Sequence, residues 1–260
     1  MTDAERLRAR QRPAGVPLMR QRWLNLGFLH WPIDPAALLP LLPPGLDLDT
    51  WAGRAYVGIV PFTIRGSRAA FLPPLPGTAN FHELNLRTYV HRRGRDPGVW
   101  FFSLDAASRL AVWGARLAYR LPYFPADITM ARGPQGVAFA SRRRGGSRAF
   151  FSCRYWPTAP ASAAAAGTLE FFLAERYRLY SWDGRALRTA RVWHRPYPLA
   201  PGRAEELTEE LASASRIILP AYDQPIVHYA GEVDVRIYPP GRVAAERQAV
   251  SAREGTHAAR

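Results

Sequence analysis

The stretch FHELNLRTYVHRRGRDPGVWFFSLDAA, residues 81–107, predicts two long strands that are joined by a charged turn and followed by a helix. Alternation in its first half gathers polar side chains on one strand face, those of Glu83, Asn85, Arg87 and Tyr89. The second half, residues 99–104, is apolar on both faces, which is typical of a strand buried from two sides, and it leads to Asp105. A polar strand face beside a buried strand predicts a binding pocket. It does not by itself identify a reaction.

The rest of the chain predicts further strands with few helices between them. Strand patterns continue from about residue 20 to residue 240, and helical patterns cover residues 106–119 and 205–215. The large apolar residues of the first of these helices form a stripe that we expect to pack on the sheet, namely Leu110, Trp113 and Leu117. The predicted fold class is α+β, mostly antiparallel β. So much sheet with few edge signals favours a barrel or a folded-over sheet.

Composition excludes several kinds of chemistry. The 260 residues are 48% hydrophobic, enough for a globular protein with a substantial core. The single cysteine, Cys153, excludes an intrachain disulfide and a multi-cysteine metal site, and we expect it to be a buried, inert thiol. All 35 basic residues are arginine. Because the chain has no lysine, no side-chain amine can form a Schiff base with a carbonyl substrate.

A formal net charge of +14 raises the question of nucleic-acid binding. Residues 1–22 contribute +4 and residues 241–260 contribute +2, so much of the excess lies near the chain ends. The densest internal cluster flanks the hairpin signal Gly145-Gly146 and consists of Arg142, Arg143, Arg144 and Arg148. We expect a solvated hairpin tip there, with Arg143 opposite Arg148. The sequence has no helix-turn-helix, zinc-finger or RNA-recognition signature, so we do not expect a nucleic-acid partner.

The domain organisation follows from where these patterns begin and end. We expect residues 1–17 to be a flexible, basic and in part helical arm, residues 18–240 to be one domain, and residues 241–260 to be a disordered tail. No apolar run approaches the roughly 18 to 20 residues that span a bilayer, and residues 1–22 lack the apolar core of a secretory signal. We therefore expect a cytoplasmic protein without a membrane partner. The sequence leaves a homo-oligomer open.

Six local strings together resemble a known family. They are FLHWPID at 28–34, GIVPF at 58–62, FHELNLRTYV at 81–90, GVWFFSLDA at 98–106, ARLAYRLPY at 115–123 and LAERYRLY at 173–180. In combination they closely resemble the YqjF-like proteins, an uncharacterised bacterial family known as domain of unknown function 2071. The resemblance covers roughly residues 18–240, and its specificity lies in the combination of strings, not in any one of them.

The resemblance implies a fold and an interior cavity. YqjF-like proteins are similar in fold to acetoacetate decarboxylase, a closed, cone-like β-barrel with helices outside. In that enzyme a lysine forms a Schiff base with a keto acid, assisted by a second lysine, an arginine and a glutamate. The resemblance implies that Glu83 takes the place of the glutamate and that Arg22 or Arg116 supplies the arginine. The stretch where lysine is expected, residues 116–123, ends in Tyr123 and contains none, which excludes decarboxylation through an imine.

The candidate site therefore has Glu83 as its acid or base. The candidate ligand-binding residues are Arg22, His30, Asn85, Arg87, Tyr89, Asp105, Arg116 and Tyr123. Simpler interpretations exist: a solvated strand face with a Glu83–Arg87 ion pair, a helix-capping role for Asp105, and a structural, hydrogen-bonded His30. The histidines show no ligand spacing, so we predict no metal site and no cofactor.

Three functions remain open. The first is the binding of a small organic carboxylate or carbonyl compound in the cavity. The second is a lyase, isomerase or hydratase that uses Glu83 in acid–base catalysis without a covalent intermediate. The third is an arginine-rich interaction or nucleic-acid-binding protein.

Overall fold

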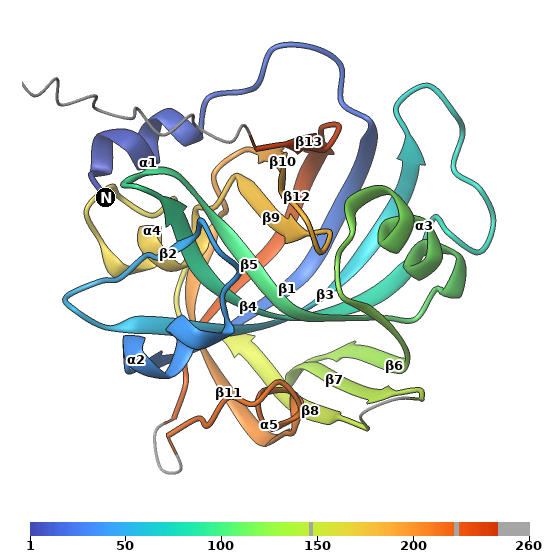
Figure 1. Cartoon of the computed structure of the whole chain (residues 1–260). Helices are drawn as coiled ribbons and strands as arrows, with labels where there is room; N and C mark the ends of the chain where they lie inside the picture. Colours follow the sequence, from blue (N-terminus) through green and yellow to red (C-terminus); the bar gives the residue numbers. More distant parts are fainter. Residues whose placement is uncertain (146–147, 221–223, 244–260) are drawn as a thin grey trace, which may run out of the picture.

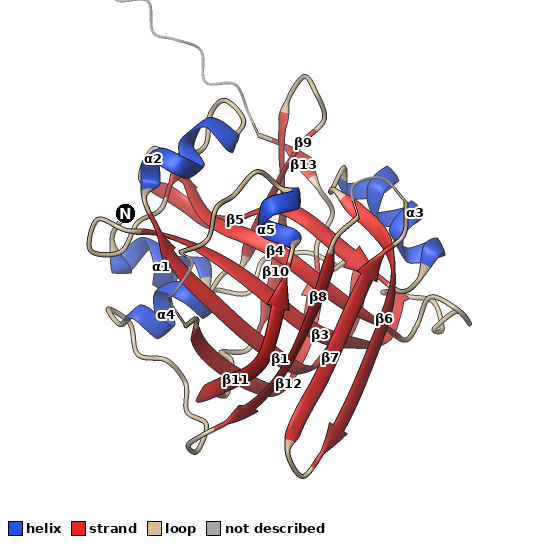
Figure 2. Ribbon diagram, turned by 90° about the horizontal axis from the view of Figure 1, so that it is seen from below, coloured by secondary structure: helices blue, strands red, loops and turns tan. Residues whose placement is uncertain are grey.

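The structure is a computed structural model, and it describes residues 1–145, 148–220 and 224–243. These residues form mostly β structure, and the short helices lie around the outside of the strands (Figures 1 and 2). The strands are β1 (Met19–Ile33), β2 (Asp47–Leu48), β3 (Ala55–Ala69), β4 (Phe81–Arg92), β5 (Arg95–Ala106), β6 (Tyr123–Gly133), β7 (Gly136–Arg143), β8 (Phe150–Pro157), β9 (Arg178–Trp182), β10 (Leu187–His194), β11 (Leu199–Glu209), β12 (Ile226–Ile237) and β13 (Gly241–Arg242). The helices are α1 (Asp3–Ala9), α2 (Pro35–Leu38), η1 (Leu39–Leu41), α3 (Arg109–Tyr119), α4 (Leu169–Ala174) and α5 (Leu211–Ala214).

The strands are hydrogen-bonded into one continuous sheet. Its order is β13-β10-β9-β5-β6-β7-β8-β11-β12-β1-β3-β4-β2, and β5 also pairs with β4 while β10 also pairs with β12. The two additional pairings join strands that lie far apart in this order, so the sheet folds back on itself. Strand pairing is antiparallel except where β5 runs parallel to β6 and β9. The expected α+β class with mostly antiparallel sheet is confirmed.

Strand β4 is buried on both faces, because a hydrophobic cluster lies on either side of it. Leu84 and Leu86 belong to a cluster that includes Phe139 and Phe151 of β7 and β8. The alternate residues of β4 form its polar face and point toward the other cluster. They are also buried, namely Glu83, Asn85, Arg87 and Tyr89. The interpretation of this polar face as a solvated outer surface is therefore wrong.

Helix α3 is present, but the side that it turns toward the sheet is not the predicted one. Ser108 caps its N-terminus by accepting a hydrogen bond from the backbone N–H of Ala111. The stripe that was expected to pack is exposed: Leu110, Trp113 and Leu117 retain 63%, 68% and 57% of their accessible surface. The residues that α3 buries are Val112 and Tyr119.

The helix predicted over residues 205–215 is largely a strand. Strand β11 extends through Glu209 and pairs with β8, and only Leu211–Ala214 form the short helix α5. Pairing with a neighbouring strand satisfies the backbone groups of this segment, so tertiary context overrides the local helical pattern.

The N-terminal arm is more ordered than expected. Helix α1 lies within it, and its Arg6 is buried against Asp49, with 2.7 Å between Nη2 and Oδ1. The predicted arm is thus helical at residues 3–9, and this helix contacts the rest of the protein through Arg6. Of the predicted disordered tail, 241–260, residues 241–242 form β13 and residues 244–260 lie outside the described residues. No helix in the described part of the chain is long and apolar enough to span a bilayer.

Candidate functional site

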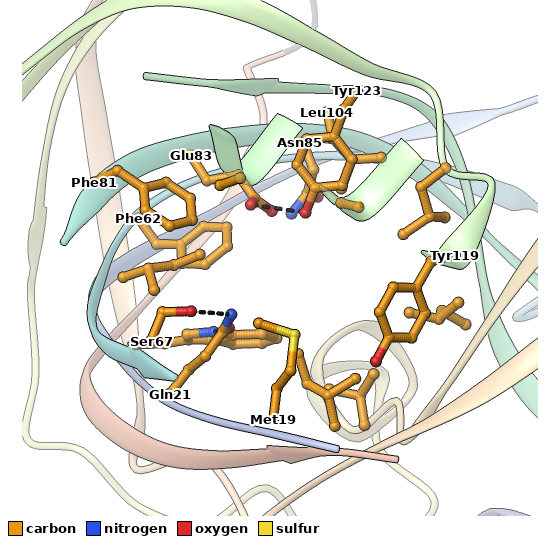
Figure 3. A pocket seen from close by; sticks show the side chains of 18 of the residues that line it. Met19, Gln21, Phe62, Ser67, Phe81, Glu83, Asn85, Leu104, Tyr119 and Tyr123 are labelled. Carbon is orange, nitrogen blue, oxygen red and sulfur yellow. Dashed lines mark hydrogen bonds between the residues drawn. The ribbon is translucent and has the colours of Figure 1, made fainter. Parts of the chain in front are cut away.

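A cavity of about 390 Å³ lies among β1, β3, β4, β5 and α3, with the loop 70–80 at one side. Most of its lining side chains are apolar, and several of the polar ones lie on opposite sides of the cavity. Figure 3 shows Glu83, Asn85 and Tyr123 on one side of the cavity and Gln21 with Ser67 on the other. Of the predicted site residues, the structure brings four to this cavity, namely Glu83, Asn85, Arg87 and Tyr123.

Glu83 and Tyr123 form a hydrogen-bonded pair. The Tyr123 hydroxyl donates to Glu83 Oε2 over 2.9 Å, and Glu83 is only 4% exposed. Burial raises the pKa of Glu83 to about 8, although the Tyr123 hydrogen bond opposes part of this rise. Burial, together with the nearby Glu83 carboxyl, also raises the pKa of Tyr123. At neutral pH this wall of the cavity is therefore uncharged, with a carboxyl group that can donate a proton.

The far end of the cavity is positively charged. Arg87 is 7% exposed, and its Nη2 donates to the carbonyl of Leu173 over 3.4 Å, whereas its Nε has no hydrogen-bond partner. Within the described residues, no carboxylate lies within ion-pairing distance of Arg87. Arg176 also lines the cavity, and it pairs with Asp49 over 2.6 Å. Asp49 is shared with a second arginine, Arg6, so the carboxylate offsets only one of the two positive charges.

Asn85 lies on β4 between Glu83 and Arg87. Its side chain is 5% exposed, and its Oδ1 has no hydrogen-bond partner. A buried amide oxygen without a partner costs free energy unless a ligand or a water molecule satisfies it. Three successive cavity-facing residues of one strand thus offer a neutral acid, an amide and a guanidinium.

His30 and Tyr89 are buried behind the cavity wall and do not line it. The Tyr89 hydroxyl donates to the Leu173 carbonyl over 2.7 Å and lies 2.6 Å from His30 Nε2, which therefore donates to it. Burial and the charge of Arg87 hold the pKa of His30 well below its usual range, so the imidazole is neutral. These two residues support Arg87 and its surroundings from outside the cavity.

Arg22 and Arg116, two of the predicted ligand-binding residues, do not line the cavity. Arg22 points away from the cavity and forms an exposed ion pair with Glu232, because its neighbours Gln21 and Trp23 occupy the inward positions of β1. Arg116 donates from Nε to the backbone carbonyl of Tyr123 over 2.7 Å. Its side chain fastens α3 to β6 and is absent from the cavity lining.

Asp105 is neither a cavity residue nor a helix cap. It forms a buried ion pair with Arg143, with 2.8 Å between Oδ1 and Nη2, and the guanidinium also lies 4.0 Å from the ring centroid of Phe124. Arg143 is 4% exposed, so its expected place on a solvated hairpin tip opposite Arg148 is wrong. The capping role falls instead to Ser108.

Other residues of the cavity were missed in the sequence. Gln21, Ser67 and Tyr119 line it, and Gln21 donates to Ser67 over 3.1 Å. Alternation along β1 places Gln21 and Trp23 on one face and could have revealed them. Nothing local marks Ser67 or Tyr119. No group of three or more His, Cys, Asp or Glu side chains that could hold a metal ion occurs in the described part of the chain.

Comparisons with known proteins identify the family of this chain. The family described as "Uncharacterized conserved protein", domain of unknown function 2071, matches residues 20–234, and the chain belongs to this family. It is 40% identical over 227 residues to "Uncharacterized protein YqjF" of Bacillus subtilis, covering 87% of this chain and 93% of the relative. The family resemblance predicted from the local strings is confirmed.

Solved structures with a similar fold are acetoacetate decarboxylase-like. Acetoacetate decarboxylase from Legionella pneumophila has a TM-score of 0.60 at 15% identity, with 94% of this chain and 96% of the other covered. An acetoacetate decarboxylase-like enzyme from Sphingomonas wittichii has a TM-score of 0.59 at 17% identity, covering 89% and 95%. The enduracididine biosynthesis enzyme MppR complexed with pyruvate has a TM-score of 0.61 at 14% identity, covering 90% and 93%. At these identities the likeness extends to the fold alone.

Proposed function

We propose that this protein binds a small organic carboxylate in its cavity, with the carboxylate held by Arg87. The observation that supports this is a buried guanidinium that lines a cavity and has no acidic partner in the described chain. A buried charge without a counter-ion is unfavourable, and the rings of Phe28 and Tyr89, 5.5 and 5.7 Å from the Arg87 guanidinium, offset only part of this cost, so an anionic ligand would relieve the rest. A guanidinium also matches a carboxylate geometrically, since two parallel N–H groups can donate to its two oxygens.

The neighbouring groups suit such a ligand. At neutral pH Glu83 is mostly protonated, because its pKa is raised to about 8, and so it does not repel an anion. Asn85 lies between Glu83 and Arg87 and can donate its amide N–H groups to a ligand oxygen. An MppR structure of similar fold is a complex with pyruvate, a small carboxylate, which is consistent with this class of ligand. A closed, cone-like barrel is part of the proposal, and the β5–β4 and β10–β12 pairings support it.

The test is a thermal-shift and calorimetric screen with small carboxylic and keto acids. A ligand at 100 times its dissociation constant should stabilise the wild type by about 2.7 kcal/mol. Arg87→Gln should abolish the effect, whereas the matched control Arg22→Gln should keep it, because Arg22 lies outside the cavity. An equal response of wild type and Arg87→Gln would refute the proposal.

Acid–base catalysis is a second candidate, and Glu83 is the observation that favours it. Its pKa of about 8 lies near the operating pH of most cells, as an efficient general acid requires, and Tyr123 holds the carboxyl in place. The reaction would be a non-covalent lyase, isomerase or hydratase step. In that case Glu83→Gln should keep ligand binding and remove turnover, whereas a pure binding protein would show no turnover in either form.

A further inference from the structure

The polar groups that β4 contributes to the cavity do not reach its mouth. Arg87 lies four residues from Glu83 along β4, a distance of about 13 Å in an extended strand. Arg87 is near Leu173 of α4, whereas Phe81, at the start of β4, adjoins the loop 70–80. From Glu83 outward the lining is predominantly apolar, with Phe62, Ile64, Phe81, Leu104 and Leu121. A ligand that placed its carboxylate at Arg87 would therefore need an apolar body to fill the rest of the cavity.

Helix α3 keeps this outer part of the cavity open by presenting small side chains to it. The residues that line the cavity at helical spacing are Ala111, Gly114, Ala115 and Ala118. A Cβ atom added at Gly114 would meet nothing within 4 Å, so free space adjoins the helix at this point. Trp113 faces away from the cavity and is exposed. Larger residues on the inner side of α3 would fill the space that the small ones leave.

The mouth itself is mostly apolar, although Arg68, next to the loop 70–80, and Thr78, within it, also line the cavity. Leu72 and Leu75 of the loop and Leu110 of α3 all line the cavity, and they remain 57%, 58% and 63% exposed. The loop is fastened to the start of the helix, since the Ser108 hydroxyl donates to the Gly77 carbonyl over 2.7 Å. Apolar side chains that are at once cavity lining and protein surface mark the place where the cavity meets solvent. They provide contacts for an aliphatic group and no hydrogen bonds for a polar one.

We infer that the ligand is an amphipathic monocarboxylic acid, with its carboxylate at Arg87 and an aliphatic tail that runs past Gly114 toward the mouth between α3 and the loop 70–80. This inference rests on the proposed function, since the carboxylate site is the same. It adds the substrate class: each methylene group that enters the apolar part of the cavity is removed from water and strengthens binding.

The test is a series of straight-chain saturated carboxylates from acetate to dodecanoate, each measured below its micelle concentration by calorimetry. In the wild type the affinity should rise about fourfold for each added methylene group, the increment for burying one CH₂, until the tail reaches solvent. Primary alcohols of the same chain lengths should bind at least tenfold more weakly, because they lack the charge that pairs with Arg87.

Gly114→Leu is the variant that tests the path of the tail. It places a side chain into the free space beside α3 and favours the helix intrinsically, so it should fold. It should weaken binding of octanoate and longer acids at least tenfold and leave acetate and butyrate unchanged. Trp113→Ala, on the outer side of the same helix, should match the wild type throughout.

The outcomes separate the two proposals. Short acids that bind in an Arg87-dependent way, without a gain in affinity along the series, would overturn the aliphatic tail and leave the proposed function standing. Identical series for wild type and Gly114→Leu would overturn the path along α3. If no acid of any length binds, or if alcohols bind as well as acids, the carboxylate site is wrong and both proposals fall.

Discussion

Replacing Glu83 with glutamine should change how the stability of this protein depends on pH. In the folded state the pKa of Glu83 is raised from its ordinary value of 4.5 to about 8, because burial of the carboxyl outweighs the opposing effect of the hydrogen bond from Tyr123. Between these two pH values the folded protein holds a proton that the unfolded chain has released. The free energy of unfolding therefore falls as the pH rises from about 4.5 to about 8.

The magnitude follows from the two pKa values. One pH unit corresponds to about 1.4 kcal/mol, so the whole difference amounts to about 5 kcal/mol, of which about 2 kcal/mol is lost between pH 6 and pH 8. Glutamine keeps the shape and the acceptor for Tyr123 but does not titrate. The free energy of unfolding of Glu83→Gln should not show this loss. The difference between the variant and the wild type should therefore shift by about 2 kcal/mol in favour of the variant as the pH rises from 6 to 8.

The assay is urea unfolding of both proteins at half-unit steps from pH 5 to pH 9. Buried histidines such as His194, whose pKa is lowered to about 4 by burial, affect both proteins equally, so the quantity to compare is the difference at each pH. Glu232→Gln, in an exposed ion pair with Arg22, is the control and should differ from the wild type by less than about 0.5 kcal/mol. If the difference in the free energy of unfolding between Glu83→Gln and the wild type does not vary with pH, the raised pKa of Glu83 is refuted.

Three further predictions concern the framework around the cavity. Asp105→Asn should cost about 3 to 5 kcal/mol in urea unfolding, because it leaves the buried Arg143 without its counter-charge; a cost below 1 kcal/mol would contradict this. Gly58→Ala should cost about 1 to 3 kcal/mol, since the new Cβ would lie 2.9 Å from His30 Cδ2; an unchanged melting temperature would mean that the imidazole can move aside. Trp113→Ser should change stability by no more than about 0.5 kcal/mol, because this tryptophan is exposed, and a larger loss would show that its ring packs in solution.

The polar face of β4 was predictable because alternation is a local property of the sequence. Once residues 81–90 are recognised as a strand, Glu83, Asn85 and Arg87 must share a face. Which face of the strand points to a cavity depends on distant parts of the chain. Here the family resemblance supplied that expectation. The same limit applies to Arg22. Its neighbours Gln21 and Trp23 point into the cavity, and Arg22, one position along β1, points outward.

Helix α3 was misjudged for a physical reason. Large apolar residues at helical spacing usually mark the buried side of a helix, because burying them yields the most free energy. Here much of the inner side borders a cavity instead of a packed core, so most of the residues that α3 presents to the cavity are small, and Trp113 faces solvent. An amphipathic pattern cannot distinguish a filled interior from one that is left open.

The buried ion pairs could not be predicted because their partners are distant in the sequence. Asp105 and Arg143 are 38 residues apart, and Arg143 sits in a run of arginines whose other members are exposed. Likewise, Arg6 and Asp49 are 43 residues apart. Charge alone suggested solvated residues in both cases.

The position of Arg6 has a practical consequence for anyone who shortens this protein. The sequence predicts a flexible arm over residues 1–17, which makes this segment a natural choice for removal before crystallisation. Yet Arg6 lies 4.8 Å from the ring centroid of Phe172 and shares Asp49 with Arg176, a cavity residue. Removal of residues 1–17 would leave Asp49 to Arg176 alone and would take the Arg6 guanidinium away from the Phe172 ring. Any binding measured on the trimmed protein would therefore report on altered surroundings of Arg176.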